Sequence, residues 1–238
     1  MKKILIVKTG DTFSDVIKTC GDFEELIVSG LGISRDKLRV VNVTAHEVLP
    51  DMEQINGVVI SGSHAMVTQN LDWSLALEAW IRKLISAGIP LLGICYGHQL
   101  MAKAMGGVVD YHPRGIEIGT TDVTCLAECL RDPLFKDLPS SFKAQVFHSQ
   151  SVIQLPPSAV LLAKNDFEPH HGFRIGGAAW GVQFHPEADV SVTRGYLENL
   201  AEDVRSDGQD PDQLIDHLEE TPHASSLLKT FGEIVTHP

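Results

Sequence analysis

PLLGICYGHQ, residues 90–99, is the stretch that decides the fold, because it joins a short apolar segment directly to a helical one. Its first half, Pro90–Ile94, has the length and composition of a strand buried on both faces. Gly93 and Gly97 stand two residues before and after Cys95. This spacing is typical of a sharp strand-to-helix turn, where a side chain at either flank would clash. The stretch predicts a strand–turn–helix unit with Cys95 at its turn.

Apolar runs and helical patterns alternate through the first half of the chain. The helical patterns lie at Leu71–Ile85 and Gly97–Met105, and Gly106-Gly107 ends the second one. Strand–helix–strand order implies right-handed crossovers and a doubly wound, mostly parallel sheet. The predicted strands, all short and rich in Val, Ile and Leu, are Lys3–Val7, Leu38–Val43, Gly57–Ile60 and Pro90–Ile94.

The pattern changes between Val108 and Val182, where short β-like segments dominate. We expect these segments to form an antiparallel β segment appended to the parallel sheet. Helices are predicted at Val190–Val204 and Pro211–Val235, and we expect the helical segment from Pro211 onward to cover the sheet or a dimer face. Residues 1–238 are assigned to a single domain with a C-terminal helical extension at about 189–238. The predicted β segments are Ile116–Val123, Phe142–Phe147, Val160–Ala163 and Gly177–Phe184.

Composition limits the classes of function. The 238 residues carry 19 Lys+Arg against 31 Asp+Glu, a net charge of −12, and 43 % of them are apolar. The chain is too apolar to be disordered, and its acidity disfavours binding to nucleic acid or an anionic membrane surface. No apolar run approaches the roughly 20 residues that span a bilayer, and four cysteines form no disulfide framework. We expect a cytoplasmic protein.

Cys95 is a candidate nucleophile. The following helix N-terminus favours a thiolate, and the backbone N–H of Tyr96 is available to a developing oxyanion. The turn would project the thiol from the carboxyl end of the sheet, where open α/β sheets bind their ligands. A lone cysteine at a tight turn is more often a small buried hydrophobe. Glycines at both flanks make the two interpretations about equal.

GVQFHPE, residues 181–187, is the second motif. Val182 and Phe184 alternate with Gln183 as in a strand, and proline favours extended geometry in the residue before it. Residues i and i+2 of an extended segment face the same side, so Glu187 is expected to orient His185. The two would complete a Cys/His/Glu triad with the thiol, and we expect activity to fall on the acid side as the histidine protonates.

The other histidines are weaker candidates, because the chain has eleven of them. His98 is expected to pack or cap locally in the helix after the turn. The following histidines are expected on the surface: His170, His171, His217, His223 and His237.

GICYGHQ (93–99) and GVQFHPE (181–187) together resemble the nucleophile and triad motifs of the class I, triad-type glutamine amidotransferase family. The order of the motifs and their separation of 90 residues (185 − 95) also fit. The resemblance extends from Lys3 to about Tyr196, and is to the amidotransferase domain of GMP synthase and its free-standing relatives. It implies a flavodoxin-like fold and no metal or organic cofactor.

The resemblance also implies the roles of individual residues. Cys95 attacks the side-chain amide of glutamine, and a γ-glutamyl thioester forms. His185, paired with Glu187, accepts the thiol proton and passes it to departing ammonia. The backbone N–H groups of Tyr96 and Ser63 hold the oxyanion; Ser63 replaces a glycine of the family's usual Ser-Gly-Gly-Pro loop.

Substrate binding is implied at three places. The first is the loop that precedes Ser63, the second is the helix after the nucleophile, and the third is HSQ at 148–150, where relatives often carry His-Gly-Asp. The residues implied are Gly62, Gln99, His148, Ser149 and Gln150.

Three functions remain open at this point. Only 51 residues (238 − 187) follow Glu187, and they contain no Gly-rich P-loop with a lysine, so this chain is not expected to aminate a nucleotide by itself. The first function is glutamine hydrolysis, free-standing or as a subunit that supplies ammonia to a separate synthetase. The second is a γ-glutamyl peptidase acting on compounds such as glutathione conjugates. The third is a non-catalytic flavodoxin-like binding protein. The expected partner is a small-molecule substrate, with a synthetase subunit or a homodimer left open.

Overall fold

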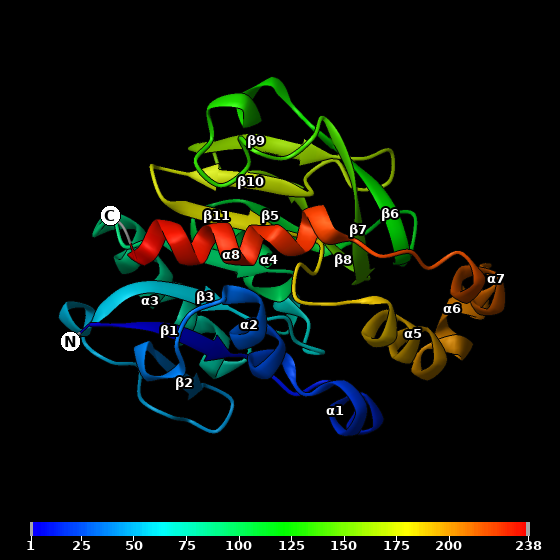
Figure 1. The fold of residues 1–238 in the computed structure, drawn as a ribbon, viewed down its shortest axis with the longest axis horizontal. Helices are drawn as coiled ribbons and strands as arrows, with labels where there is room; N and C mark the ends of the chain where they lie inside the picture. Colours follow the sequence, from blue (N-terminus) through cyan, green and yellow to red (C-terminus); the bar gives the residue numbers. More distant parts are fainter. Residues whose placement is uncertain (1, 237–238) are drawn as a thin grey trace.

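A nine-stranded sheet in the order β2-β1-β3-β4-β11-β10-β9-β6-β7 runs through the computed structural model, which describes residues 2–236 (Figure 1). The first five strands in this order are parallel, and four of them, β1 to β4, were predicted as parallel from their continuous apolar sequences. The expectation that the segment containing β11 belongs to the antiparallel part is wrong, because β11 pairs in parallel with β4. Each of the other four runs antiparallel to its neighbour. The parallel strands are β1 (Lys3–Lys8), β2 (Leu38–Asn42), β3 (Ile55–Ile60), β4 (Leu91–Ile94) and β11 (Ala179–Val182).

The antiparallel strands extend the same sheet, and the predicted fold class is confirmed. Three strands escaped prediction, namely β5, β8 and β10, because each has only four or five residues and lacks a clear apolar alternation. Strands β5 (Val108–Tyr111) and β8 (Gln150–Gln154) form a separate pair. The antiparallel strands of the large sheet are β6 (Glu117–Cys125), β7 (Ser141–His148), β9 (Ala159–Lys164) and β10 (Gly172–Ile175).

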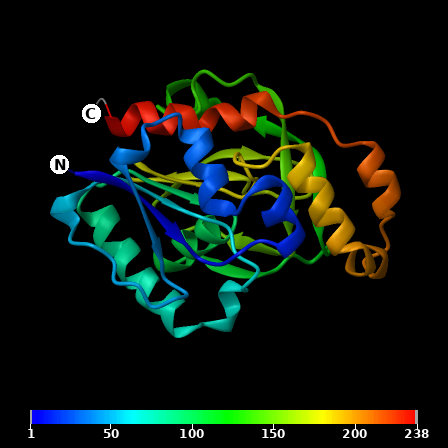
Figure 2. The same cartoon turned by 60° about the horizontal axis from the view of Figure 1, so that its bottom comes forward.

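Helices cover both faces of the sheet (Figures 1 and 2). On one face lie α3 (Asp72–Ser86) and α4 (Tyr96–Ala104), which bury apolar side chains against the strands. On the other face α2 (Phe23–Leu31) packs along α8 (Pro222–Thr236). The helical spacing of apolar residues in α3 predicted its bounds to within a residue. In contrast, α2 was not predicted.

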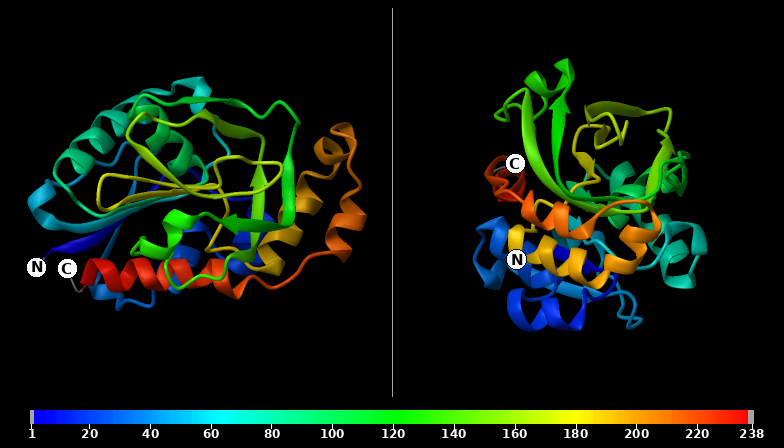
Figure 3. Two further views of the ribbon diagram at one scale, coloured as in Figure 1. Left: turned by 90° about the horizontal axis from the view of Figure 1, so that it is seen from above. Right: turned by 90° about the vertical axis from the view of Figure 1, so that its right-hand side faces the viewer.

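A third apolar cluster lies at one end of the molecule, where α5 (Val190–Asn199), α6 (Ala201–Ser206) and α7 (Pro211–Asp216) gather (Figure 3). Helix α1 (Ser14–Cys20), also not predicted, packs against α5. The single helix expected from Val190 to Val204 is wrong, because the chain breaks at Leu200 between α5 and α6.

The single helix expected from Pro211 to Val235 is also wrong. Proline has no N–H and is tolerated only in the first turn of a helix, so Pro222 begins α8 instead of continuing α7. None of the helices within residues 2–236 is both long and apolar enough to cross a membrane. The described part of the chain also contains four short 3₁₀ turns: η1 (Arg35–Lys37), η2 (Met52–Gln54), η3 (Val67–Gln69) and η4 (Ala127–Arg131).

Candidate active site

Cys95 occupies a one-residue turn between β4 and α4. Its φ of +47° and ψ of −96° are strained for a residue with a side chain. The flanks allow no side chain: a Cβ on Gly93 would lie 2.5 Å from the backbone of Gly97, and a Cβ on Gly97 would lie 2.7 Å from the carbonyl oxygen of Ile60. As the first residue of α4, Tyr96 has a backbone N–H that the helix itself leaves without an acceptor.

β11 brings the second motif beside this turn. It pairs with β4 in parallel register, and the N–H of Cys95 donates to the carbonyl of Val182 at 2.8 Å. Nδ1 of His185 lies 2.8 Å from Oε1 of Glu187, and both side chains are buried. The predicted extended geometry is wrong here, because β11 ends at Val182 and a turn follows in which Ala188 N–H donates to His185 O. The turn, not a shared strand face, brings carboxylate to imidazole.

The groups around the His185 ring favour its protonated form. Burial disfavours the imidazolium, but the charges of Glu187 and Cys95 outweigh it and raise the pKa of His185 to about 9. The expectation that the ring gains its proton on the acid side of neutrality is therefore wrong. Phe147 stacks on the ring with centroids 3.7 Å apart and carries Tyr196 on its other face at 3.8 Å. Neither aromatic was singled out, because nothing local distinguishes them from core residues.

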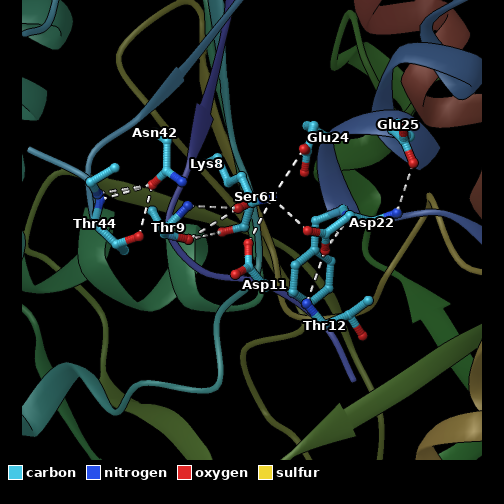
Figure 4. Close-up of polar contacts among 12 residues, drawn as sticks. Lys8, Thr9, Asp11, Thr12, Asp22, Glu24, Glu25, Asn42, Thr44 and Ser61 are labelled. Atoms are coloured by element: carbon cyan, nitrogen blue, oxygen red, sulfur yellow. Dashed lines mark hydrogen bonds and ion pairs between the residues drawn. The ribbon is translucent and has the colours of Figure 1, made fainter. Parts of the chain in front are cut away.

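The loop after β3 is tied to the end of β1 (Figure 4). The hydroxyl of Thr9 donates to Gly62 O at 2.8 Å and lies 3.0 Å from the hydroxyl of Ser61. The hydroxyl of Ser63 donates to Thr9 O at 2.7 Å. Within residues 2–236, positive φ in non-glycine residues is confined to His46, Asn70 and Cys95, so Ser63 stands in this loop without left-handed strain. Thr9 was not identified from the sequence.

A buried lysine supports the same region. Lys8 contacts the carboxylates of Asp11 (2.7 Å), Asp22 and Glu24 (3.0 Å), as Figure 4 shows. Burial opposes the charge of Lys8, but these ion pairs raise its pKa above the ordinary value. Asp22 caps α2 by accepting from Phe23 N–H, and the Phe23 ring stacks on His185 at a centroid distance of 6.3 Å. The lysine thereby fixes the helix that backs the imidazole.

A cavity of about 600 Å³ opens at the carboxyl end of the parallel strands. Gly62, His185 and Glu187 are not among its lining residues. A Cβ on Gly62 would lie 3.0 Å from His185 Cε1, so the glycine leaves room for the ring. At its outer end the cavity is bounded by Leu200, Asp203, Ser206 and Asp207. Its inner end gathers the other predicted site residues: Ser63, Cys95, Tyr96, Gln99, His148, Ser149 and Gln150.

His148 stands behind the cavity as part of a buried ion pair. Its Nε2 lies 2.8 Å from Glu117 Oε2, and its Nδ1 lies 3.1 Å from the Gln150 carbonyl. Because both ring nitrogens face acceptors, the ring is an imidazolium. Burial opposes this charge, but Glu117 raises the pKa of His148 and is itself held ionised by the two histidines that it contacts. The second is His171, whose Nε2 lies 3.4 Å from the same carboxylate.

The expectation that His171 lies on the surface is therefore wrong, since its side chain is fully buried, and His170 is half-buried. His217 and His223 are exposed, and His237 lies outside the described residues. His98 packs against Phe173 inside the molecule, as predicted. Within residues 2–236 no group of three or more His, Cys, Asp or Glu side chains could hold a metal ion.

A glycine-flanked cysteine between a parallel strand and a helix, beside a buried histidine–glutamate pair, is an arrangement typical of enzymes with a cysteine nucleophile. Residues 16–203 match the family model "Glutamine amidotransferase class-I". The chain therefore belongs to the class I glutamine amidotransferase family.

The relatives include γ-glutamyl peptidases, GMP synthases and a γ-glutamyl-L-1-hydroxyisopropylamide hydrolase of Pseudomonas. γ-Glutamyl peptidase 4 of Arabidopsis thaliana is 33 % identical over 84 % of this chain and 80 % of the peptidase. The glutamine-hydrolysing GMP synthase of Aeropyrum pernix is 34 % identical over 77 % of this chain but only 35 % of the synthase. A glutamine amidotransferase structure from Thermotoga maritima superposes over the whole of both chains with a TM-score of 0.78 at 20 % identity, which shows the shared fold.

Proposed function

We propose that this protein hydrolyses γ-glutamyl amide bonds through a thioester on Cys95. The observation that carries the proposal is the strained thiol beside the His185–Glu187 pair, at the inner end of a cavity large enough for an amino-acid amide. Glutamine is the simplest such substrate. In the proposed resting state the buried imidazolium lies beside the Cys95 sulfur and stabilises its thiolate.

The reaction follows from this resting state. The Cys95 thiolate attacks the γ-carbonyl carbon, and the N–H groups of Tyr96 and Ser63 stabilise the oxyanion. His185 gives its proton to the departing amine, which leaves a γ-glutamyl thioester. The now neutral ring removes a proton from water, the resulting hydroxide attacks the thioester, and glutamate departs as the thiolate and imidazolium re-form. Glu187 holds the ring in position throughout.

The glutamyl head group has a matching set of contacts. Both hydrogens of the Gln99 amide are used inside the protein, in bonds to Gln150 O at 2.7 Å and to Gln183 Oε1 at 3.1 Å. Its carbonyl oxygen is left to accept from the substrate's ammonium group. We propose that the backbone at Ser149 and Gln150, beside the His148 imidazolium, receives the α-carboxylate, and that Gly62 keeps the loop close to the reacting carbonyl.

The size of the cavity favours amines larger than ammonia. Ammonia needs almost no space, whereas the cavity extends from Cys95 to Asp203 and Asp207 on and after α6. This favours γ-glutamyl peptidase activity, in keeping with relatives of that name that match over most of their length. The alternative, glutamine hydrolysis that supplies ammonia to a separate synthetase subunit, draws support from the GMP synthase relatives.

A competition assay that measures glutamate release tests the proposal. Glutamine, a γ-glutamyl amide of a neutral amine, and glutathione are offered separately and together. We expect the neutral amide to be consumed fastest, because two carboxylates and no Lys or Arg side chain are found among the described residues of the cavity wall. Faster turnover of glutamine alone would favour the ammonia-supplying role. No glutamate from any of them, with Cys95 shown to be reduced, would contradict the proposed function.

A further inference from the structure

Gln183 is a fully buried residue whose side chain contacts the reacting sulfur. Its Nε2 lies 3.4 Å from Cys95 Sγ, and no part of the residue is exposed to solvent. The contact follows from the sheet, because Gln183 comes directly after β11 and Cys95 directly after the parallel neighbour β4. None of the roles proposed above uses this side chain toward the thiol.

The orientation of the amide is fixed by a chain of hydrogen bonds. A backbone carbonyl can only accept, so the Gln99 atom 2.7 Å from Gln150 O must be the amide nitrogen. The same nitrogen lies 3.1 Å from the Gln183 side chain, which must present its oxygen. The opposite end of that amide, the NH₂ group, therefore faces Cys95.

We propose that Gln183 donates a hydrogen bond to the Cys95 thiolate, and that Gln99 is a positioning residue that holds the Gln183 amide in this orientation. The inference rests on the proposed function in one respect, namely that Cys95 reacts as a thiolate. A hydrogen bond to an ionised acceptor is stronger than one to a neutral acceptor, so the contact stabilises the thiolate over the thiol. It also directs the sulfur toward the cavity.

The hydrogen-bonded chain from Gln150 O through the Gln99 and Gln183 amides to Cys95, here called the relay, links the proposed substrate-binding segment to the thiol. Gln150 O accepts both from Gln99 and from the His148 ring, so the segment proposed to bind the substrate head group and the nucleophile share one buried amide chain. The titratable groups around the thiol are the His185 ring with its partner Glu187, the His148 imidazolium, and the Tyr196 hydroxyl, which lines the same cavity. Substituting Gln183 by a neutral residue leaves all four in place.

The test is the rate at which iodoacetamide alkylates Cys95 as a function of pH, followed by mass spectrometry of the peptide that contains it. The thiolate is the reactive form, and no substrate is needed. In Gln183→Met, which keeps the length of the side chain but removes the donor, we expect the rate at neutral pH to fall about ten-fold. The midpoint of the pH profile should move up by about one pH unit.

Three further variants keep the test decisive. Gln213→Met, on the exposed face of α7, is the matched control and should leave the midpoint unchanged. Gln99→Leu should move the midpoint in the same direction as Gln183→Met but less, because the freed amide can still face the sulfur part of the time. If Gln183→Met does not fold, as judged by circular dichroism, Gln183→Glu replaces it and should raise the midpoint further by repulsion.

An unchanged midpoint in a folded Gln183 variant would overturn the relay. Failure of the wild-type protein to release glutamate from any γ-glutamyl amide, with the shifted midpoint still observed in Gln183→Met, would count against the proposed function and leave the relay standing. The two inferences therefore fail separately.

Discussion

The two ends of the cavity are built differently. At the inner end Cys95 lines the cavity, and both Cys95 and its neighbour His185 stand on loops that follow adjacent parallel strands, with their side chains buried. At the outer end Asp203 and Ser206 are exposed on the short helix α6, which packs against the helices α5 and α7. The difference teaches that the groups proposed to do the chemistry are held by the sheet, whereas the wall that meets the leaving amine can vary without disturbing it.

Removal of the proposed nucleophile is the change at the inner end from which we expect the largest effect. Cys95→Ala leaves the turn and the cavity but no sulfur, so we expect glutamate release to fall at least about 10⁴-fold for every γ-glutamyl amide. The measurement is a glutamate assay on folded protein. Normal activity in this variant would remove Cys95 from the mechanism.

Replacing Glu187, the carboxylate proposed to orient His185, tests the same end of the cavity through the loss of one negative charge. A pKa raised to about 9 means that His185 is protonated below that pH, so wild-type activity should decline on the alkaline side as the imidazolium loses its proton. In Glu187→Gln the raising charge is gone, and the ring should titrate at lower pH with activity reduced about 10²- to 10⁴-fold. NMR of the imidazole resonances gives the midpoint directly.

Glu219→Gln is the matched control for this prediction, because Glu219 is exposed and its ion pair with Lys143 is on the surface. It should alter neither the ring titration nor the rate. A His185 midpoint that is the same in Glu187→Gln and in the wild type would contradict the electrostatic account of the pair.

Filling the outer end gives the smallest effect and separates the two ends most clearly. Ser206→Trp adds bulk at the rim, so kcat/KM for a γ-glutamyl amide of a large amine should fall about ten-fold, with glutamine turnover changed less than about two-fold. Ser226→Trp, on an exposed position of α8, is the control. Equal losses for both substrates in Ser206→Trp would show that the ends are not independent.

Much of the inner end is predictable from short stretches of sequence, because local geometry decides it. The glycines on either side of Cys95 indicate a tight turn with no room for side chains at its flanks. His185 and Glu187 lie within one three-residue stretch. The prediction gave the wrong geometry for that stretch, since alternation in β11 does not reveal where the strand ends. It also treated His171 as exposed, because the carboxylate that accompanies it belongs to a strand about fifty residues away.

The sequence by itself determined the parallel strands β1 to β4, the amphipathic helix α3 and the strained cysteine, since these depend on hydrophobic periodicity and on backbone angles within a few residues. It did not determine that β11 joins them in parallel. Only the tertiary structure decided that Gln183 meets Cys95, that Thr9 holds the loop of Ser63, and that α6 closes the cavity. Those contacts join residues 54 to more than 80 positions apart, and strand order brings them together. No local pattern encodes which side chains meet at the carboxyl ends of neighbouring strands.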